Sequence, residues 1–346
     1  MFNVRARDLD YSTGQTFWVG ASDTPRCTLE TLAQDIFRFH TKHAEYDPAL
    51  SGAEWWTQVI DRNDDIGWHW DKDYAMEHNG INVHPHLGTV SYFSSGRGAP
   101  TLVLDCRAPM ETVDSCESDA STVWVSCPVQ GKHMCFDGRF LHSASAELAH
   151  EMEGDAWDTS NAQGKGKKEE EPRVTFLVNV WLNHRPEAAV PLKDKVASRL
   201  SQTRVTHDLV THHLPCCGGN HDDHQHENNH VHHHGHTHTH AHAHERAAVE
   251  SDVVKIEVER GAELVDMSWE FGESQGPPGE QKPVVHRVTV PVPVARLANL
   301  TKAADRTSAT PDAMVIQYHQ MNTPVPTVIR VPKKMKLGGP SRKNEP

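Results

Sequence analysis

The sequence predicts a mainly β protein with flanking helices (α+β). Between Glu54 and Trp181 it carries six short runs rich in β-branched and aromatic residues, separated by Gly, Pro, Asn and Asp. Four more runs of this kind follow between Val253 and Pro332. Many short strands at such spacing are typical of a sandwich or barrel, of which the double-stranded jelly roll is one form.

Two segments have the pattern of helices rather than strands. In residues 28–43, TLETLAQDIFRFHTKH, apolar residues recur at i, i+3 and i+4, and Thr28 is a candidate N-cap. Residues 191–202, PLKDKVASRLSQ, form a shorter candidate. We expect both helices to flank the sheets.

Changes in composition divide the chain into unequal parts. Residues 1–210 are expected to form the main domain, interrupted at 151–172 by a polar, charged surface insertion. Residues 211–247 are a His-rich, low-complexity segment that we expect to be disordered. Residues 248–332 are a β-rich C-terminal extension that either packs on the main domain or forms a separate module. Residues 333–346 are a basic tail, either solvated or a localisation or binding patch.

Composition limits the compartment and the partners. The 346 residues carry a formal net charge of −13, which argues against non-specific nucleic-acid binding. No run of 18 apolar residues is present, and the first residues lack the apolar core of a signal peptide, so we expect no membrane partner. The cysteine count of seven is odd and mostly scattered, which indicates a reducing compartment without a disulfide framework. A cytoplasmic protein is expected, with the nucleus as an alternative.

The first chemical motif lies in GWHWDKDY, residues 67–74. In a strand, residues i and i+2 point to one face, so His69 and Asp71 project together while Trp68 and Trp70 project to the other side. An imidazole and a carboxylate on one face can be two ligands of a divalent metal. Alone, the H-x-D tripeptide is equally consistent with a hydrogen-bonded pair on a solvated edge.

A third candidate ligand and a buried cation follow in the sequence. In FDGRFLHSAS, a tight turn at Asp137-Gly138 delivers His142 onto the next strand. In PRVTFLVNVWLNH, one strand face is wholly apolar, whereas the other carries Arg173, Thr175, Leu177, Asn179 and Trp181. An inward-pointing arginine in a barrel is costly unless an anion meets it, and its planar fork matches a carboxylate.

These motifs resemble the Fe(II)/2-oxoglutarate-dependent dioxygenase superfamily. The resemblance covers residues 67–181 and depends on H-x-D, on the distal histidine in DGRFLH and on R-x-T in RVT. Two histidines and one carboxylate form the facial triad of non-haem Fe(II) oxygenases. The resemblance implies a double-stranded β-helix (jelly-roll) core. It also implies a C–H hydroxylation that releases succinate and CO2.

The resemblance also assigns roles to individual residues. It implies Fe(II) held by His69, Asp71 and His142, with 2-oxoglutarate and O2 as co-substrates and ascorbate as a candidate accessory. The far carboxylate of 2-oxoglutarate is expected on Arg173, with Thr175, Tyr92, Thr89 and Ser91 as further candidates. Strand parity separates Tyr92 from Thr89 and Ser91, so these three cannot all face the pocket. Asn179, Trp181 and Arg139 are candidates for the substrate side; the alternatives are that Trp181 belongs to the core and that Arg139 reaches solvent.

One departure from the family pattern and two comparisons with subgroups of the superfamily refine the resemblance. His142 and Arg173 are 31 positions apart, farther than in the family, and the insertion at 151–172 accounts for the excess. The nucleic-acid repair demethylases of the superfamily carry a second arginine where this chain has Asn179. The related halogenases replace the metal carboxylate, whereas Asp71 is present. A small molecule or a protein side chain is therefore the expected substrate.

The histidine tract gives the chain a second possible function. The sequence HVHHHGHTHTHAHAH is expected to bind borderline metals loosely. It is a metal reservoir or sensor, a pH-responsive segment, or an unselected insertion. The alternatives to an enzyme are thus a metal-binding or storage protein acting through this tract, or an inert jelly-roll binding module. The candidate loose ligands in the tract are His232, His233, His234, His236, His238 and His240.

Overall fold

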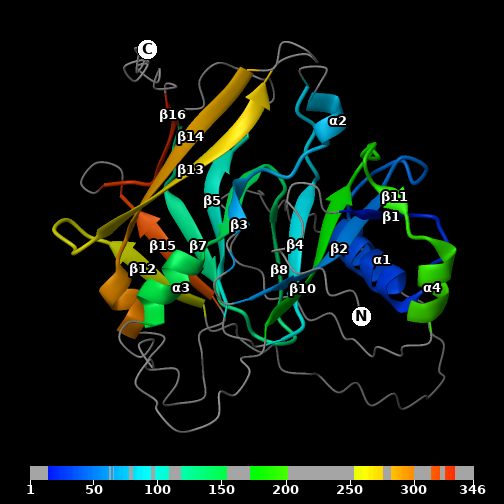
Figure 1. The fold of residues 1–346 in the computed structure, drawn as a ribbon, viewed down its shortest axis with the longest axis horizontal. Coiled ribbons are helices and arrows are strands. Elements are labelled where there is room, and N and C mark those ends of the chain that lie inside the picture. The colour runs from blue at the N-terminus through cyan, green and yellow to red at the C-terminus, as the bar shows by residue number, and fades with distance from the viewer. Residues whose placement is uncertain are drawn as a thin grey trace, which may run out of the picture.

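In its described residues, the computed structural model contains three β-sheets and few helices, which confirms the mainly β prediction (Figure 1). None of the helices in the described parts is long and apolar enough to cross a membrane. The structure describes residues 15–61, 64, 66–77, 81–94, 98–108, 118–153, 172–201, 253–275, 282–299, 313–319 and 324–331.

The first sheet has six strands. Its longest strands, the third and fourth in the order below, pair antiparallel over nine positions, from Arg173 opposite Ile60 to Trp181 opposite Gly52. In spatial order the strands are β11 (Val190–Pro191), β1 (Phe17–Gly20), β2 (Gly52–Ile60), β10 (Arg173–Trp181), β4 (Leu87–Tyr92) and β8 (His133–Asp137).

The second sheet also has six strands and faces the first. A shared core of side chains from both sheets, including Tyr92, Val103 and Trp124, fills the space between them. In spatial order the strands are β12 (Val253–Val258), β15 (Ala313–Tyr318), β7 (Thr122–Ser126), β5 (Thr101–Arg107), β9 (Phe140–Ala144) and β3 (Ile66–His69).

The chain passes repeatedly between these two sheets. Strands β2, β4, β8 and β10 lie in the first sheet, and β3, β5, β7 and β9 lie in the second. Following the chain from β2 to β10, the two sheets receive strands in turn, except that β5 and β7, separated by β6 (Ser118–Asp119) of the third sheet, both join the second sheet. Segments distant in sequence, such as β2 and β10, thereby become neighbours.

The third sheet packs on the outer face of the second. It consists of β13 (Val265–Gln275), β14 (Lys282–Val292), β16 (Thr327–Val331) and β6 (Ser118–Asp119), in that order. Its aromatic residues contact the two tryptophans of the H-x-D segment: Trp269 lies 5.6 Å from Trp68, and Phe271 lies 5.6 Å from Trp70, between ring centroids. The strands after residue 250 therefore both extend the second sheet and cover it.

The helices lie at the periphery. The predicted helix at 28–43 is confirmed as α1 (Thr28–Thr41), and the one at 191–202 as α4 (Asp194–Leu200). Leu32, Ile36 and Phe37 of α1 pack on the outer face of the first sheet, where α4 contributes Ala197. Cys27, not Thr28, occupies the N-cap position of α1, without a side-chain hydrogen bond. The remaining helices are α2 (Tyr74–Glu77) and α3 (Ala146–Glu153).

Candidate metal centre

His69, Asp71 and His142 lie together, as the sequence predicts. Their ligand atoms are all within 4.8 Å of one another. His69 Nε2 is 3.6 Å from one oxygen of Asp71, and His142 Nε2 is 3.6 Å from the other. These separations are too long for hydrogen bonds. Two ligands about 2.1 Å from one ion lie roughly 3–3.5 Å apart, so the spacing suits a shared metal.

Pairing of β3 with β9 positions the two imidazoles. His69 and His142 are direct partners across these strands, and their ring centroids are 4.3 Å apart. The alternation of the segment sends Trp68 and Trp70 into the core beneath the third sheet, which turns His69 and Asp71 toward the first sheet. The tryptophans thus fix the direction of the two ligands.

Backbone carbonyls orient both rings. The Nδ1 atom of His69 lies 2.8 Å from Gly67 O, and that of His142 lies 3.0 Å from Phe140 O. Because a carbonyl only accepts, each Nδ1 carries the proton and each Nε2 presents its lone pair. This arrangement is typical of metal-binding histidines. Burial, together with the neighbouring His69, lowers the pKa of His142 to about 4.

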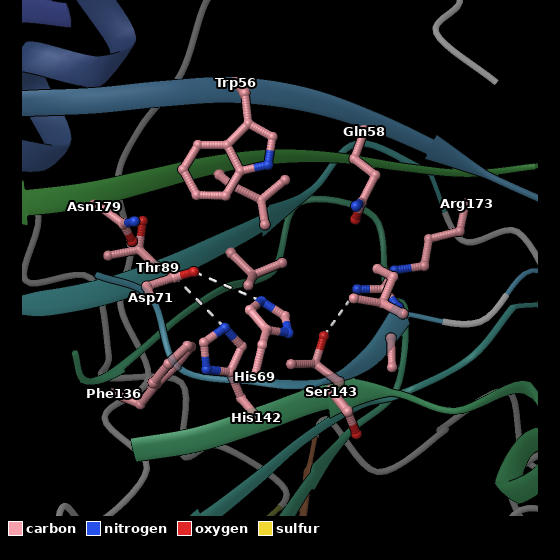
Figure 2. Close-up of a pocket in the computed structure, with 15 residues that line it drawn as sticks. Trp56, Gln58, His69, Asp71, Thr89, Phe136, His142, Ser143, Arg173 and Asn179 are labelled. Atoms are coloured by element: carbon pink, nitrogen blue, oxygen red, sulfur yellow. Dashed lines mark hydrogen bonds and ion pairs between the residues drawn. The ribbon is translucent and has the colours of Figure 1, made fainter. Parts of the chain in front are cut away.

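A pocket between the facing sheets runs from these ligands to Arg173 (Figure 2). Its cavity volume is about 30 Å³, so the pocket is narrow in this structure. Asp71 is the one carboxylate among the described residues that line it. In Figure 2, Asn179 lies at the end of the pocket near Asp71, and Arg173 lies at the opposite end.

Arg173 is buried and held from several sides. Only 2% of its surface is exposed. Its Nη1 donates to Ala99 O and its Nη2 donates to Thr101 Oγ1 over 2.8 Å. The guanidinium also lies 5.3 Å from the centre of the Tyr92 ring, within reach of a cation–π interaction. The charge is therefore fixed in place before any ligand arrives.

The other predicted co-substrate contacts have different environments. Thr175 is fully buried on the Arg173 face of β10 and is not itself among the pocket-lining residues, and its hydroxyl has no hydrogen-bond partner among the described residues. Tyr92 does not line the pocket, because its hydroxyl points to Thr101 Oγ1 at 2.7 Å. Thr89 lines the pocket, but its hydroxyl donates to Val178 O. Ser91 contacts His133 instead.

Of the predicted substrate-side residues, the structure brings Asn179 alone to the pocket. Trp181 is 1% exposed, packs with Trp18 and donates from Nε1 to Glu54 over 2.8 Å. Arg139 lies in the turn before β9 and binds Asp137 through Nε and Nη2. Trp181 therefore belongs to the core, and Arg139 lies at the half-exposed surface. These are the alternatives that the sequence left open.

Two polar residues near the site, Gln58 and Glu54, were not identified from the sequence, which indicates Trp56 beside them as a core or lid residue next to the site. Trp56 and Gln58 line the pocket from β2. Glu54 on the same strand is a buried carboxylate whose pKa is raised by burial, despite hydrogen bonds from Thr16, Trp181 and Asn179. In the segment EWWTQVI, alternate residues share one strand face, so all three lie on the same face. The polar residues on that face were the signal in the sequence that it borders a site.

A second histidine pair lies apart from the metal ligands. His133 of β8 contacts His40 of α1, with their Nε2 atoms 2.9 Å apart, and its Nδ1 contacts Ser91 Oγ. Burial lowers the pKa of His133 to about 3. The predicted loose metal ligands of the histidine tract, in contrast, lie outside the described residues.

No protein-family model and no curated protein matches the chain.

Proposed function

We propose that the protein is an Fe(II)- and 2-oxoglutarate-dependent oxygenase that hydroxylates a substrate C–H bond. The overall reaction converts R–H, 2-oxoglutarate and O2 into R–OH, succinate and CO2. A small molecule or a protein side chain remains the expected substrate. The observation that carries the proposal is the placement of a buried arginine and a His-Asp-His cluster at opposite ends of one pocket.

The topology supports membership in this superfamily. The return of the chain between two facing sheets, from β2 through β10, is the strand pattern that a double-stranded β-helix requires. We therefore interpret β2, β10, β4 and β8 as one sheet of such a core, and β3, β9, β5 and β7 as the other. The additional strands β12 and β15 widen the second sheet.

The donor set fits a metal with open coordination positions. Two neutral imidazole nitrogens and one carboxylate would hold Fe(II) as a facial triad and leave positions for ligands. When bound, Fe(II) supplies the activation of O2 and the binding of the 2-oxo acid. The protein contributes fixed ring orientations through Gly67 O and Phe140 O.

The far end of the pocket fits a carboxylate. The planar fork of the buried Arg173 matches a carboxylate, and a dicarboxylate can place one carboxylate there while its other end reaches the candidate metal ligands. Arg173 and the adjacent Thr175 would bind and orient the co-substrate. The pocket walls of Trp56, Val90 and Leu177 would exclude water around it.

An inert binding module has no need for this combination of groups. The pocket combines a buried arginine at one end with two histidines and a carboxylate at the other, whereas a binding scaffold needs no such pairing. A metal-storage role through the histidine tract predicts instead that metal binding survives loss of the pocket ligands. The two functions therefore make different predictions for the same variants.

The test starts with binding and proceeds to turnover. Full-length protein loaded with Mn(II), which occupies Fe(II) sites without oxidative turnover, is titrated with 2-oxoglutarate by calorimetry. We expect one 2-oxoglutarate per chain, bound only with metal present and lost in Arg173→Met. The Fe(II)-loaded protein should then form succinate from 2-oxoglutarate and O2, whereas His69→Ala should not.

A metal-loaded protein that binds no 2-oxoglutarate would overturn the proposal. Metal binding that persists unchanged in His69→Ala but disappears when residues 216–247 are deleted would favour the storage function.

A further inference from the structure

Gln58 carries two buried polar atoms that the protein itself does not satisfy. The side chain is 4% exposed, and neither Nε2 nor Oε1 has a hydrogen-bond partner among the described residues. Figure 2 shows the carboxamide pointing into the pocket, between Trp56 and Arg173. Native structures rarely leave such groups bare, so an unmet carboxamide indicates a missing partner.

The strand register places Gln58 at the arginine end of the pocket. Gln58 of β2 is the direct partner of Thr175 on β10, and Thr175 is two residues from Arg173. The hydroxyl of Thr175 is also buried and lacks a partner among the described residues. Asn179, near the metal ligands, lies four residues farther along the same strand. Ser143 Oγ, next to His142, also lacks a partner among the described residues, but Gln58 and Thr175 together bring three unmet polar atoms to the arginine end.

We propose that Gln58 is a specificity-determining residue that donates from Nε2 to the far carboxylate of the 2-oxo acid. This inference rests on the proposed function and adds a residue to it. Arg173 supplies the positive charge, and Gln58 and Thr175 supply two neutral donors. The Oε1 atom then faces a donor such as an ordered water.

This arrangement predicts selectivity among 2-oxo acids. A 2-oxo dicarboxylate meets both donors with its far carboxylate. A five-carbon 2-oxo monocarboxylate, 2-oxopentanoate, has the same length but ends in a methyl group, so it leaves both donors unmet. Discrimination by unmet buried donors is stronger than discrimination by shape alone. Removing the Gln58 amide should therefore reduce selectivity and not merely affinity.

The experiment compares two ligands on Mn(II)-loaded, full-length protein by calorimetry. For Gln58→Leu, we expect 2-oxoglutarate affinity to fall about 10- to 100-fold, the range of one hydrogen bond to a charged group. Affinity for 2-oxopentanoate should not change. Gln58→Glu places a negative charge against the carboxylate and should weaken 2-oxoglutarate more than Gln58→Leu does. Gln130→Leu, in an exposed turn, is the matched control and should retain the wild-type values.

The unfolding midpoint of the metal-free protein provides an independent readout. If Gln58 serves the ligand, Gln58→Leu removes a bare buried amide and the midpoint should stay equal or rise. A structural role for Gln58 predicts a lower midpoint instead.

The outcomes separate the inference from the proposed function. Wild-type protein that binds no 2-oxoglutarate overturns both. Wild-type binding with an unchanged 2-oxoglutarate affinity in Gln58→Leu overturns the role of Gln58 and leaves the oxygenase proposal standing. Equal weakening of both ligands also overturns it, because the effect would then not come from the far carboxylate.

Discussion

Gly88 of β4 lies directly beneath the ring of Phe136, and we predict that a methyl group there disturbs the metal centre. A Cβ atom on Gly88 would lie 2.8 Å from both Cε2 and Cζ of Phe136. The ring of Phe136 in turn lies 4.8 Å from that of His142, between centroids. Since ordinary carbon contacts are about 3.5–4 Å, Gly88→Ala forces the ring to move by roughly 1 Å. His142 stands next to that ring.

Gly88→Ala should have two effects. Overpacking should lower the free energy of unfolding, and the displaced His142 should lower the metal affinity. Overpacking a well-filled core costs about 1–3 kcal/mol, so urea unfolding of the metal-free Gly88→Ala protein should show a loss of this size. Disturbing the surroundings of a ligand typically costs about 10- to 100-fold in metal affinity. Calorimetric titration with Mn(II) measures the second effect.

A second substitution tests whether the ring transmits the change. Phe136→Leu in the Gly88→Ala background makes room for the new methyl group and should restore most of the metal affinity. A double-mutant cycle then gives a coupling energy of about 1 kcal/mol or more between the two positions. The reasoning is refuted if Gly88→Ala unfolds and binds Mn(II) as wild type does.

Three other predictions follow from the structure. Asp71→Ala should abolish succinate formation, whereas deletion of residues 216–247 should spare it, as measured by succinate release from Fe(II)-loaded protein. Because the pKa of His133 is about 3 in the folded protein and about 6.5 in the unfolded chain, the unfolded chain binds more protons below pH 6.5. The contribution of His133 to the free energy of unfolding should therefore be complete above pH 6.5 and fall by about 2 kcal/mol between pH 7 and pH 5. Urea unfolding of His133→Gln at both pH values should show a loss smaller than that of the wild type by this amount. Trp181→Phe leaves a buried Glu54 oxygen without its donor at 2.8 Å and should lower the free energy of unfolding by about 1–3 kcal/mol; an unchanged value would show that this bond contributes nothing.

Local patterns were sufficient to predict that His69, Asp71 and His142 lie together. The alternation of GWHWDKDY set His69 and Asp71 against two buried tryptophans, and the turn before β9 brought His142 opposite His69. These outcomes depend on strand parity and turn chemistry, which act over a few residues. The buried face of β10 was predictable for the same reason, because its apolar alternation runs without interruption for nine residues.

Long-range placement was not predictable in the same way. Parity allowed Tyr92 to face the space between the sheets, but only the position of β5 shows that its hydroxyl binds Thr101. The alternation of β2 put Gln58 on one face, yet nothing local indicates that this face meets Thr175. The third sheet was also missed as a separate layer. Apolar and polar residues do alternate along β13, but nothing local indicates that its Trp269 and Phe271 pack on Trp68 and Trp70.

The pairing of β15 with β7 has a consequence for the growing polypeptide. Met314 pairs with Val125, so about 190 residues must leave the ribosome after β7 before its partner emerges. At roughly 5–20 residues per second, β7 waits on the order of 10–40 s with one edge unpaired. During that interval the apolar segment TVWVS is open to wrong pairing with other chains. Chaperone demand during synthesis is therefore expected to depend on how quickly the last third of the protein is translated.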